Sequence, residues 1–160
     1  MTEKMRREKQ ALEKAEIDRI LERNTSGVLA LMDKDGYPYA VPLSYVYENG
    51  KIYFHSAKTG HKIDAVRFCD KASFCVIDKD DVQPEKYTTF YKSVIAFGKA
   101  EIVQSEEEAL YAMKALGEKY YPDHDEALNA ELERFKSAFA VIKFSIEHIT
   151  GKQARELMKQ

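Results

Sequence analysis

Residues 28–55, VLALMDKDGYPYAVPLSYVYENGKIYFH, contain three apolar runs separated by two turn sequences. Asp35-Gly36 and Asn49-Gly50 are dipeptides favoured in the tight turns that join antiparallel strands. The stretch therefore predicts two consecutive β-hairpins, with strands over 28–32, 37–47 and 51–55. Pro38 and Pro42 cannot donate hydrogen bonds to a ladder, so the middle strand is expected at a sheet edge, a bulge or a ligand.

The rest of the chain alternates strand and helix patterns. Further strands are expected over 71–78, 87–103 and 139–146, with Gly98 marking a bend or bulge in the second of them. Helical spacing of apolar residues predicts helices over 60–69, from Ser105 as N-cap, and over 125–136. A polar loop is predicted for 79–86 and a polar tail for 147–160, with a turn at Thr150-Gly151-Lys152. Six strands in successive hairpins, with helices inserted later, predict an α+β antiparallel barrel with flanking helices.

Length and composition are typical of one globular domain. The 160 residues are 44% hydrophobic and 32% charged, and the formal net charge is −2. We expect a helical arm over residues 1–24 and a single domain over 25–160; whether the arm lies on its own barrel or on a partner's stays open. The charge gives no basic footprint for nucleic acid, and no run of about 18 apolar residues predicts a membrane span. We expect a cytoplasmic protein.

Cysteine and histidine spacing predicts no metal site. Cys69 and Cys75 lack the partners of a zinc site or a disulfide framework and are interpreted as small buried hydrophobic residues. His55 and His61 lack carboxylate or thiolate company. The remaining histidines, His124 and His148, are expected at the surface.

The segment YFHSAKTGHK, residues 53–62, changes from strand to helix and is rich in hydrogen-bonding groups. A helix beginning near Gly60 has free amides and a partial positive charge at its first turn, which suits a phosphate. Lys62 adds a full charge, and hydroxyl or imidazole donors come from Ser56, Thr59 and His61. The alternative is an ordinary solvated turn between a strand and a helix.

Together these motifs resemble a known family. Residues 37–77, the segment TTFYKSVIAFGKAEIV (88–103) and ITGK (149–152) are similar to the flavin-binding split-barrel relatives of pyridoxamine 5'-phosphate oxidase, in particular the nitroimidazole reductase (nitroimidazole-resistance) branch. The resemblance covers about residues 25–152. It implies a six-stranded antiparallel split β-barrel and a homodimer that binds flavin mononucleotide (FMN) at the subunit interface.

The resemblance also implies roles for residues in three segments. One set would line the flavin ring and ribityl chain, a second would contact the ribityl and phosphate groups, and a third would approach from the partner subunit or the C-terminal segment. In chain order these are Val41, Pro42, Leu43, Ser44; Phe54, His55, Ser56, Ala57, Gly60, His61, Lys62; and Tyr91, Lys92, Ser93, Lys152.

The expected activity is reduction of a small electrophile, such as a nitroaromatic, by an external electron donor. His55 either supplies a proton to the reduced group or only binds the cofactor. Lys92, His55 or Lys152 could raise the flavin potential. The chain has no tryptophan, and Arg155 is the only arginine near its end, which argues against oxidation of pyridoxamine 5'-phosphate. The alternatives are a non-catalytic flavin- or haem-binding protein, with His55 or His61 as the haem ligand, and an empty dimeric scaffold.

Overall fold

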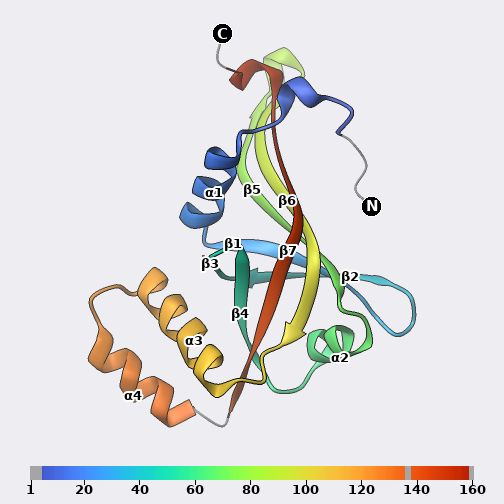
Figure 1. Ribbon diagram of the computed structural model, residues 1–160. Helices are drawn as coiled ribbons and strands as arrows, with labels where there is room; N and C mark the ends of the chain where they lie inside the picture. Colours follow the sequence, from blue (N-terminus) through green and yellow to red (C-terminus); the bar gives the residue numbers. More distant parts are fainter. Residues whose placement is uncertain (1–4, 136–137, 159–160) are drawn as a thin grey trace.

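The computed structural model describes residues 5–135 and 138–158 and contains one seven-stranded antiparallel sheet flanked by helices (Figure 1). The side chains of residues 134 and 135 are not described. The order of strands across the sheet is β2-β1-β5-β6-β7-β4-β3. The strands are β1 (Ser26–Met32), β2 (Pro38–Ser44), β3 (Val46–Glu48), β4 (Lys51–Ala57), β5 (Lys71–Gln83), β6 (Thr88–Ile102) and β7 (Phe139–Gln153).

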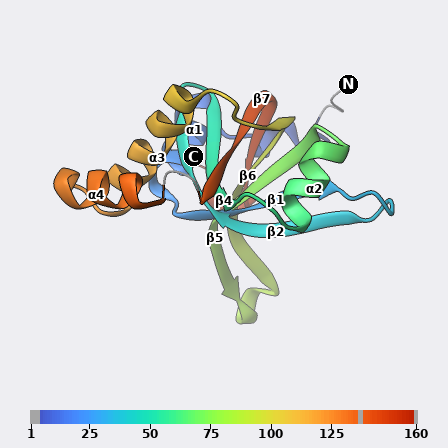
Figure 2. The same ribbon diagram turned by 90° about the horizontal axis from the view of Figure 1, so that it is seen from below.

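Helices cover the sides of this sheet. Figure 2 shows α3 and α4 on one side of the barrel and α2 on the opposite side. The α-helices are α1 (Lys14–Arg23), α2 (His61–Phe68), α3 (Glu106–Tyr120) and α4 (Asp125–Phe135), and the short 3-10 turns are η1 (Glu8–Gln10), η2 (Pro84–Lys86) and η3 (Arg155–Leu157). The Ser105 hydroxyl accepts a hydrogen bond from the Glu108 amide, which confirms the predicted N-cap of α3. Residues 1–4, Lys136 and the last two residues of the predicted tail lie outside the described residues.

The split-barrel fold class predicted from the resemblance is confirmed, and the sheet remains open. Both predicted hairpins form. Asn49 and Gly50 have φ values of 51° and 77°, the left-handed conformation that a two-residue hairpin turn requires. The sheet has seven strands rather than six because the predicted 37–47 strand divides at Tyr45. The Tyr45 amide donates to the Tyr120 hydroxyl on α3 instead of continuing a ladder.

Two predictions of irregular structure were wrong. The expected polar loop over 79–86 instead continues β5 to Gln83, paired with β6 in a long ribbon. The expected turn and tail after 147 instead continue β7 to Gln153. In the ribbon, polar side chains lie on both faces, so the sequence does not show the alternation of apolar and polar residues that is typical of a strand. In β7, a register shift opposite Phe97/Gly98 interrupts this alternation.

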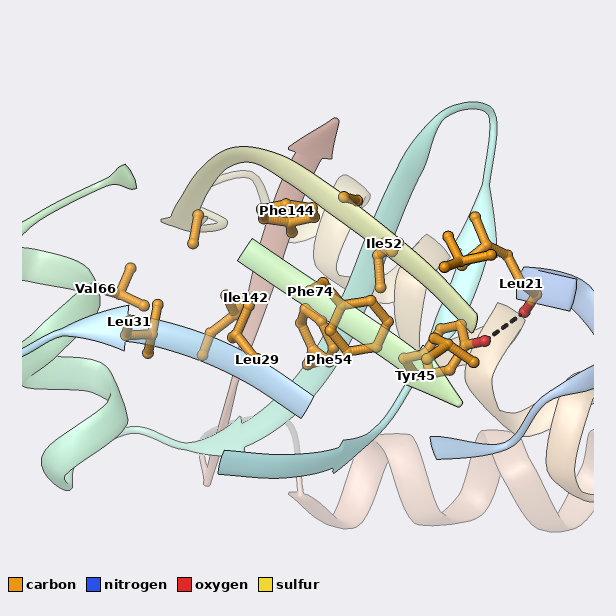
Figure 3. Close-up of a cluster of buried hydrophobic side chains, with 14 of the residues drawn as sticks. Leu21, Leu29, Leu31, Tyr45, Ile52, Phe54, Val66, Phe74, Ile142 and Phe144 are labelled. Atoms are coloured by element: carbon orange, nitrogen blue, oxygen red, sulfur yellow. Dashed lines mark hydrogen bonds between the residues drawn. The ribbon is translucent and has the colours of Figure 1, made fainter. Parts of the chain in front are cut away.

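The core lies inside the curved sheet and is closed at one end by α1. Phe74 makes edge-to-face contacts with Tyr45 and Phe54, and all three side chains are buried (Figure 3). The Tyr45 hydroxyl donates to the Leu21 carbonyl of α1 at 2.7 Å. Ile20 and Leu21 are fully buried in the same cluster. The helix of the N-terminal arm therefore packs on the barrel of its own chain.

No helix in the described ranges is long and apolar enough to cross a membrane.

Candidate functional site

The opening of the sheet lies between β2 and β4. β2 pairs only with β1, and β3 covers β4 only as far as Tyr53. In the described residues no strand therefore pairs with the outer edge of β2 or with that edge of β4 over 54–57. The two strands approach each other across this opening. Of the three positions that Pro38 and Pro42 allowed, a sheet edge, a bulge or a ligand, the structure shows the edge, because both prolines lie on β2.

Helix α2 begins directly beyond the end of β4. Its N-cap is Gly60, which has no side chain to cap the helix. The amides of Ile63 and Asp64 bond to the Gly60 carbonyl, whereas those of His61 and Lys62 find no acceptor in the described part of the chain. The Lys62 ammonium also has no carboxylate within 4.0 Å among those residues. Two free amides and one free cation at a helix start suit the three acceptor oxygens of a phosphate.

The His61 side chain packs on the first hairpin. Its ring stacks on Tyr39 with centroids 4.2 Å apart, and its Nε2 lies 3.5 Å from the Asp33 carboxylate. That carboxylate is fixed by the amides of Asp35 and Tyr37, which donate to it. Sequence reasoning did not predict the contacts of Asp33 and Tyr39 with His61, because their proximity depends on how α2 folds back over the first hairpin. His61 thus has protein partners that Lys62 lacks.

Alternation along β4 separates the predicted residues of that strand. The Phe54 side chain is fully buried against Phe74, so only its backbone can face a ligand. The Ser56 hydroxyl is also buried and donates to the Ala57 carbonyl. The imidazole of His55, between them, is exposed and has no hydrogen-bond partner among the described residues. On this strand, His55 is therefore the side chain available for chemistry.

The outer face of the sheet carries several other predicted residues. Along β2 the side chains of Pro42 and Ser44 face outward, while Val41 and Leu43 pack toward the core. On β6 and β7, Ser93 pairs with Lys152. The Lys152 ammonium lies 5.7 Å from the ring centroid of Tyr91.

Apolar side chains lie between these groups. One row of paired residues crosses five strands from Pro42 through Val28, Cys75 and Ile95 to Thr150. Ile95 is 40% exposed and Val28 37%, and Cys75 is half-buried rather than fully buried as predicted. Strands about 4.8 Å apart place β2 and β7 roughly 19 Å apart along such a row. One chain therefore carries the outward residues of β2 and those of β6 and β7 on a single face, but it does not bring the two sets of residues into contact.

Lys92 faces the other way and belongs to an ion-pair network. Its ammonium lies 3.1 Å from a Glu16 carboxylate oxygen on α1. Arg19 and Arg23 contact the same carboxylate at 2.7 and 3.2 Å. Hydrogen bonds from Arg19 and then Lys92 lower the pKa of Glu16 to about 2, against an ordinary value of 4.5. The network joins the N-terminal helix to β6.

This network predicts a loss of stability in acid. A carboxylate with a lowered pKa stabilises the fold above its ordinary pKa, and this contribution disappears as the pH falls from 4.5 through 2. We expect Glu16→Gln to lower the free energy of unfolding by about 1 kcal/mol at pH 6, because the network is partly solvated. Urea unfolding from pH 6 to 2 should show the two proteins converging. Glu22→Gln, on the same helix, is the control; a constant difference down to pH 2 would contradict the pKa shift.

Comparisons with known proteins agree with this architecture. The family described as pyridoxamine 5'-phosphate oxidase matches residues 13–153. No curated protein matches the sequence. A FAD-binding protein from Mesorhizobium loti is 27% identical, with a TM-score of 0.61, 90% of this chain covered and 96% of that one.

Two further solved structures have the same fold at lower identity. A FAD and haem binding protein from Mycobacterium smegmatis is 18% identical, with a TM-score of 0.80, 94% of this chain covered and 76% of that one. A proposed 5-nitroimidazole antibiotic resistance protein from Bacteroides thetaiotaomicron is 23% identical, with a TM-score of 0.74, 89% of this chain covered and 85% of that one.

Proposed function

Because the chain belongs to the pyridoxamine 5'-phosphate oxidase family, we propose that it binds FMN and uses it to reduce a small electrophile, with nitroaromatic compounds as the first class to test. The observation that carries the proposal is the uncapped start of α2 beside the two unpaired strand edges. This arrangement supplies charge, free amides and open backbone groups within one short region.

The residues present fit the phosphate end of FMN. The amides of His61 and Lys62 and the Lys62 ammonium have no competing acceptors among the described residues. Asp33 adds a negative charge nearby, and the His61 Nε2 lies 3.5 Å from its carboxylate. Lys62 is therefore the cation proposed to hold the phosphate, and His61 a support that positions the hairpin against α2.

The ring of the flavin is proposed to lie along the β2 edge, where Val41 to Ser44 expose backbone groups. Bound FMN would supply the electron transfer. Of the three groups considered for proton supply or charge compensation, Lys92 is paired with Glu16 and Lys152 lies over Tyr91. His55 is exposed and unpartnered in the described structure, so we assign it the transfer of a proton to the reduced group.

A homodimer would bring together the site residues of β2 and those of β6 and β7, which lie apart in one chain. Ile77, Ile95 and Phe97 are 63%, 40% and 48% exposed on the outer face that also carries Pro42, Ser44 and Ser93. An apolar face of this kind is typical of an interface. Pairing it with a second copy would cover these side chains and bring Tyr91, Ser93 and Lys152 of one subunit toward β2 of the other.

A second candidate is a cofactor-binding protein without turnover of its own. The structural relative from Mycobacterium smegmatis is named for FAD and haem binding, and His55 offers an exposed imidazole as an axial ligand. Absorption spectra separate the candidates. Flavin bands that bleach on addition of a nicotinamide donor and return with a nitroaromatic acceptor support the reductase. A dominant Soret band supports haem binding, and a colourless protein that does not bind FMN overturns both.

The most direct test of the phosphate site is Lys62→Ala. Loss of a charge-assisted hydrogen bond is expected to weaken FMN binding by about 1.5–3 kcal/mol, roughly 10- to 150-fold. Titration of the apoprotein with FMN, followed by fluorescence quenching, measures this. Arg67→Ala, which removes an exposed cation from the last turn of the same helix, is the matched control. Equal FMN affinity in the Lys62 variant and the wild type would remove Lys62 from the site.

A further inference from the structure

The ammonium group of Lys119 has only uncharged partners. Lys119 is half-buried in the last turn of α3, which faces the junction of α1 and β1 (Figure 1). Its Nζ donates to the Asn24 carbonyl at 2.6 Å and lies 4.1 Å from the ring centroid of Tyr45 and 5.7 Å from that of Tyr120. These contacts join α3 to the end of α1 and to the residue that divides β2 from β3.

The groups around this ammonium are occupied by other contacts. The Tyr120 hydroxyl donates to the Thr25 carbonyl and accepts a hydrogen bond from the Tyr45 amide, so the two rings are fixed relative to each other. The charged groups beside them, Arg23 and Asp78, pair with each other at 2.6 Å. The Asp78 carboxylate is therefore already neutralised by a guanidinium group.

Two other partly buried lysines differ, because each has a carboxylate partner. Lys92 lies 3.1 Å from a Glu16 oxygen, and Lys143 lies 2.8 Å from a Glu101 oxygen. Over residues 5–135 and 138–158, no carboxylate oxygen lies within 4.0 Å of the Lys119 Nζ. Ring faces and a carbonyl stabilise an ammonium less than a carboxylate does. Burial therefore dominates and lowers the pKa of Lys119 to about 8, against an ordinary value of 10.5.

The geometry allows the neutral form of this amine to react. After losing one proton, the amine can still donate an N–H to the Asn24 carbonyl, which holds the nitrogen in place and leaves its lone pair free. Tyr120 is 40% exposed, so the cluster borders solvent rather than the interior of the barrel. A lysine amine that is neutral near physiological pH is a nucleophile toward carbonyl carbons.

We propose that Lys119 is a site of acylation by activated acyl groups, namely acyl phosphates and thioesters. The amine nitrogen bonds to the carbonyl carbon, the bond from that carbon to the phosphate oxygen or to sulfur breaks, and the amine passes a proton to the departing group. The product is a neutral amide, which keeps one N–H for the Asn24 carbonyl. The site includes none of the residues assigned to FMN and does not rest on the proposed flavin chemistry.

Incubation of the full chain with acetyl phosphate at pH 7.5, followed by peptide mass spectrometry, tests the proposal. Lys119 should be acetylated about tenfold faster than Lys114, an exposed lysine on the same helix, because its larger neutral fraction outweighs its lower nucleophilicity. The rate at Lys119 should level off above pH 8, where most of this amine is neutral. A rate at Lys119 equal to or below that at Lys114 would overturn the proposal.

Two controls separate the folded cluster from other causes of selectivity. With the uncharged thioester N,S-diacetylcysteamine, the preference for Lys119 over Lys114 should persist; a preference seen only with acetyl phosphate would indicate attraction of an anion and would contradict the proposal. In guanidinium chloride, the unfolded chain should be acetylated at both lysines at similar rates, because the preference depends on burial. A preference that survives unfolding would assign it to local sequence and exclude a role of the cluster.

Discussion

Replacing His55 with alanine is expected to slow the reduction of a nitroaromatic acceptor by about 10²–10⁴-fold while FMN stays bound. The reason is the alternation along β4: Phe54 and Ser56 are buried, so His55 is the exposed titratable side chain of this strand end. Single-turnover oxidation of the reduced protein by the acceptor measures the step directly, and the flavin absorbance measures retention in the same sample.

Two variants distinguish a chemical role of His55 from a binding role. His55→Gln keeps a hydrogen-bonding group but cannot transfer a proton at neutral pH, so it should be as slow as the alanine variant. His124→Ala, at an exposed histidine that contacts Tyr121 and the Pro122 carbonyl, should react like the wild type. Loss of flavin in His55→Ala with retention in His55→Gln would assign His55 to cofactor binding. An unchanged rate in both would exclude a proton-transfer role.

Gly98→Ala is expected to lower the free energy of unfolding by about 3 kcal/mol or more. Gly98 lies on β6 at the register shift in the pairing between β6 and β7. A Cβ at this position would overlap the carbonyl oxygen of Ser145 and approach the Glu147 amide within 3.2 Å. Both are backbone atoms of the adjacent strand, so the clash cannot be relieved by turning a side chain.

Urea unfolding followed by circular dichroism tests this prediction, with Gly117→Ala as the control. At Gly117 the added methyl group would meet only the side chain of Leu128, which can move, and alanine is the better helix former. We expect the Gly117 variant to stay within about 1 kcal/mol of the wild type. A Gly98 variant equally close to the wild type would show that the strands at the shift can separate at little cost.

Local sequence was sufficient for much of the barrel. The turn dipeptides predicted both hairpins, and two prolines limited the position of β2 to a sheet edge, a bulge or a ligand, of which the structure shows the edge. The same local reasoning failed for the ends of β5 and β7. The β5–β6 ribbon is stabilised by pairing between strands rather than by burial, so its polar residues resemble those of a loop. A register shift interrupts the alternation in β7, and this shift exists only in the context of its partner strand.

The residues of the candidate site were likewise predicted only in part from the sequence. The change from strand to helix at residues 53–62 identified the start of α2 and Lys62 from local pattern alone. Sequence could not show that His61 stacks on Tyr39 beside Asp33, or that Lys92 pairs with Glu16. Each of these contacts joins residues brought together only when distant elements pack.

Turn chemistry, apolar periodicity and free helix amides act within a few residues, so most of the strands, both hairpins and the start of α2 could be derived from the chain order alone. Strand register, the open edge between β2 and β4, and the choice of which cations are paired depend on contacts between residues far apart in the chain. These were decided only by the tertiary structure, because a side chain's charge partner and its exposure are set by what packs against it.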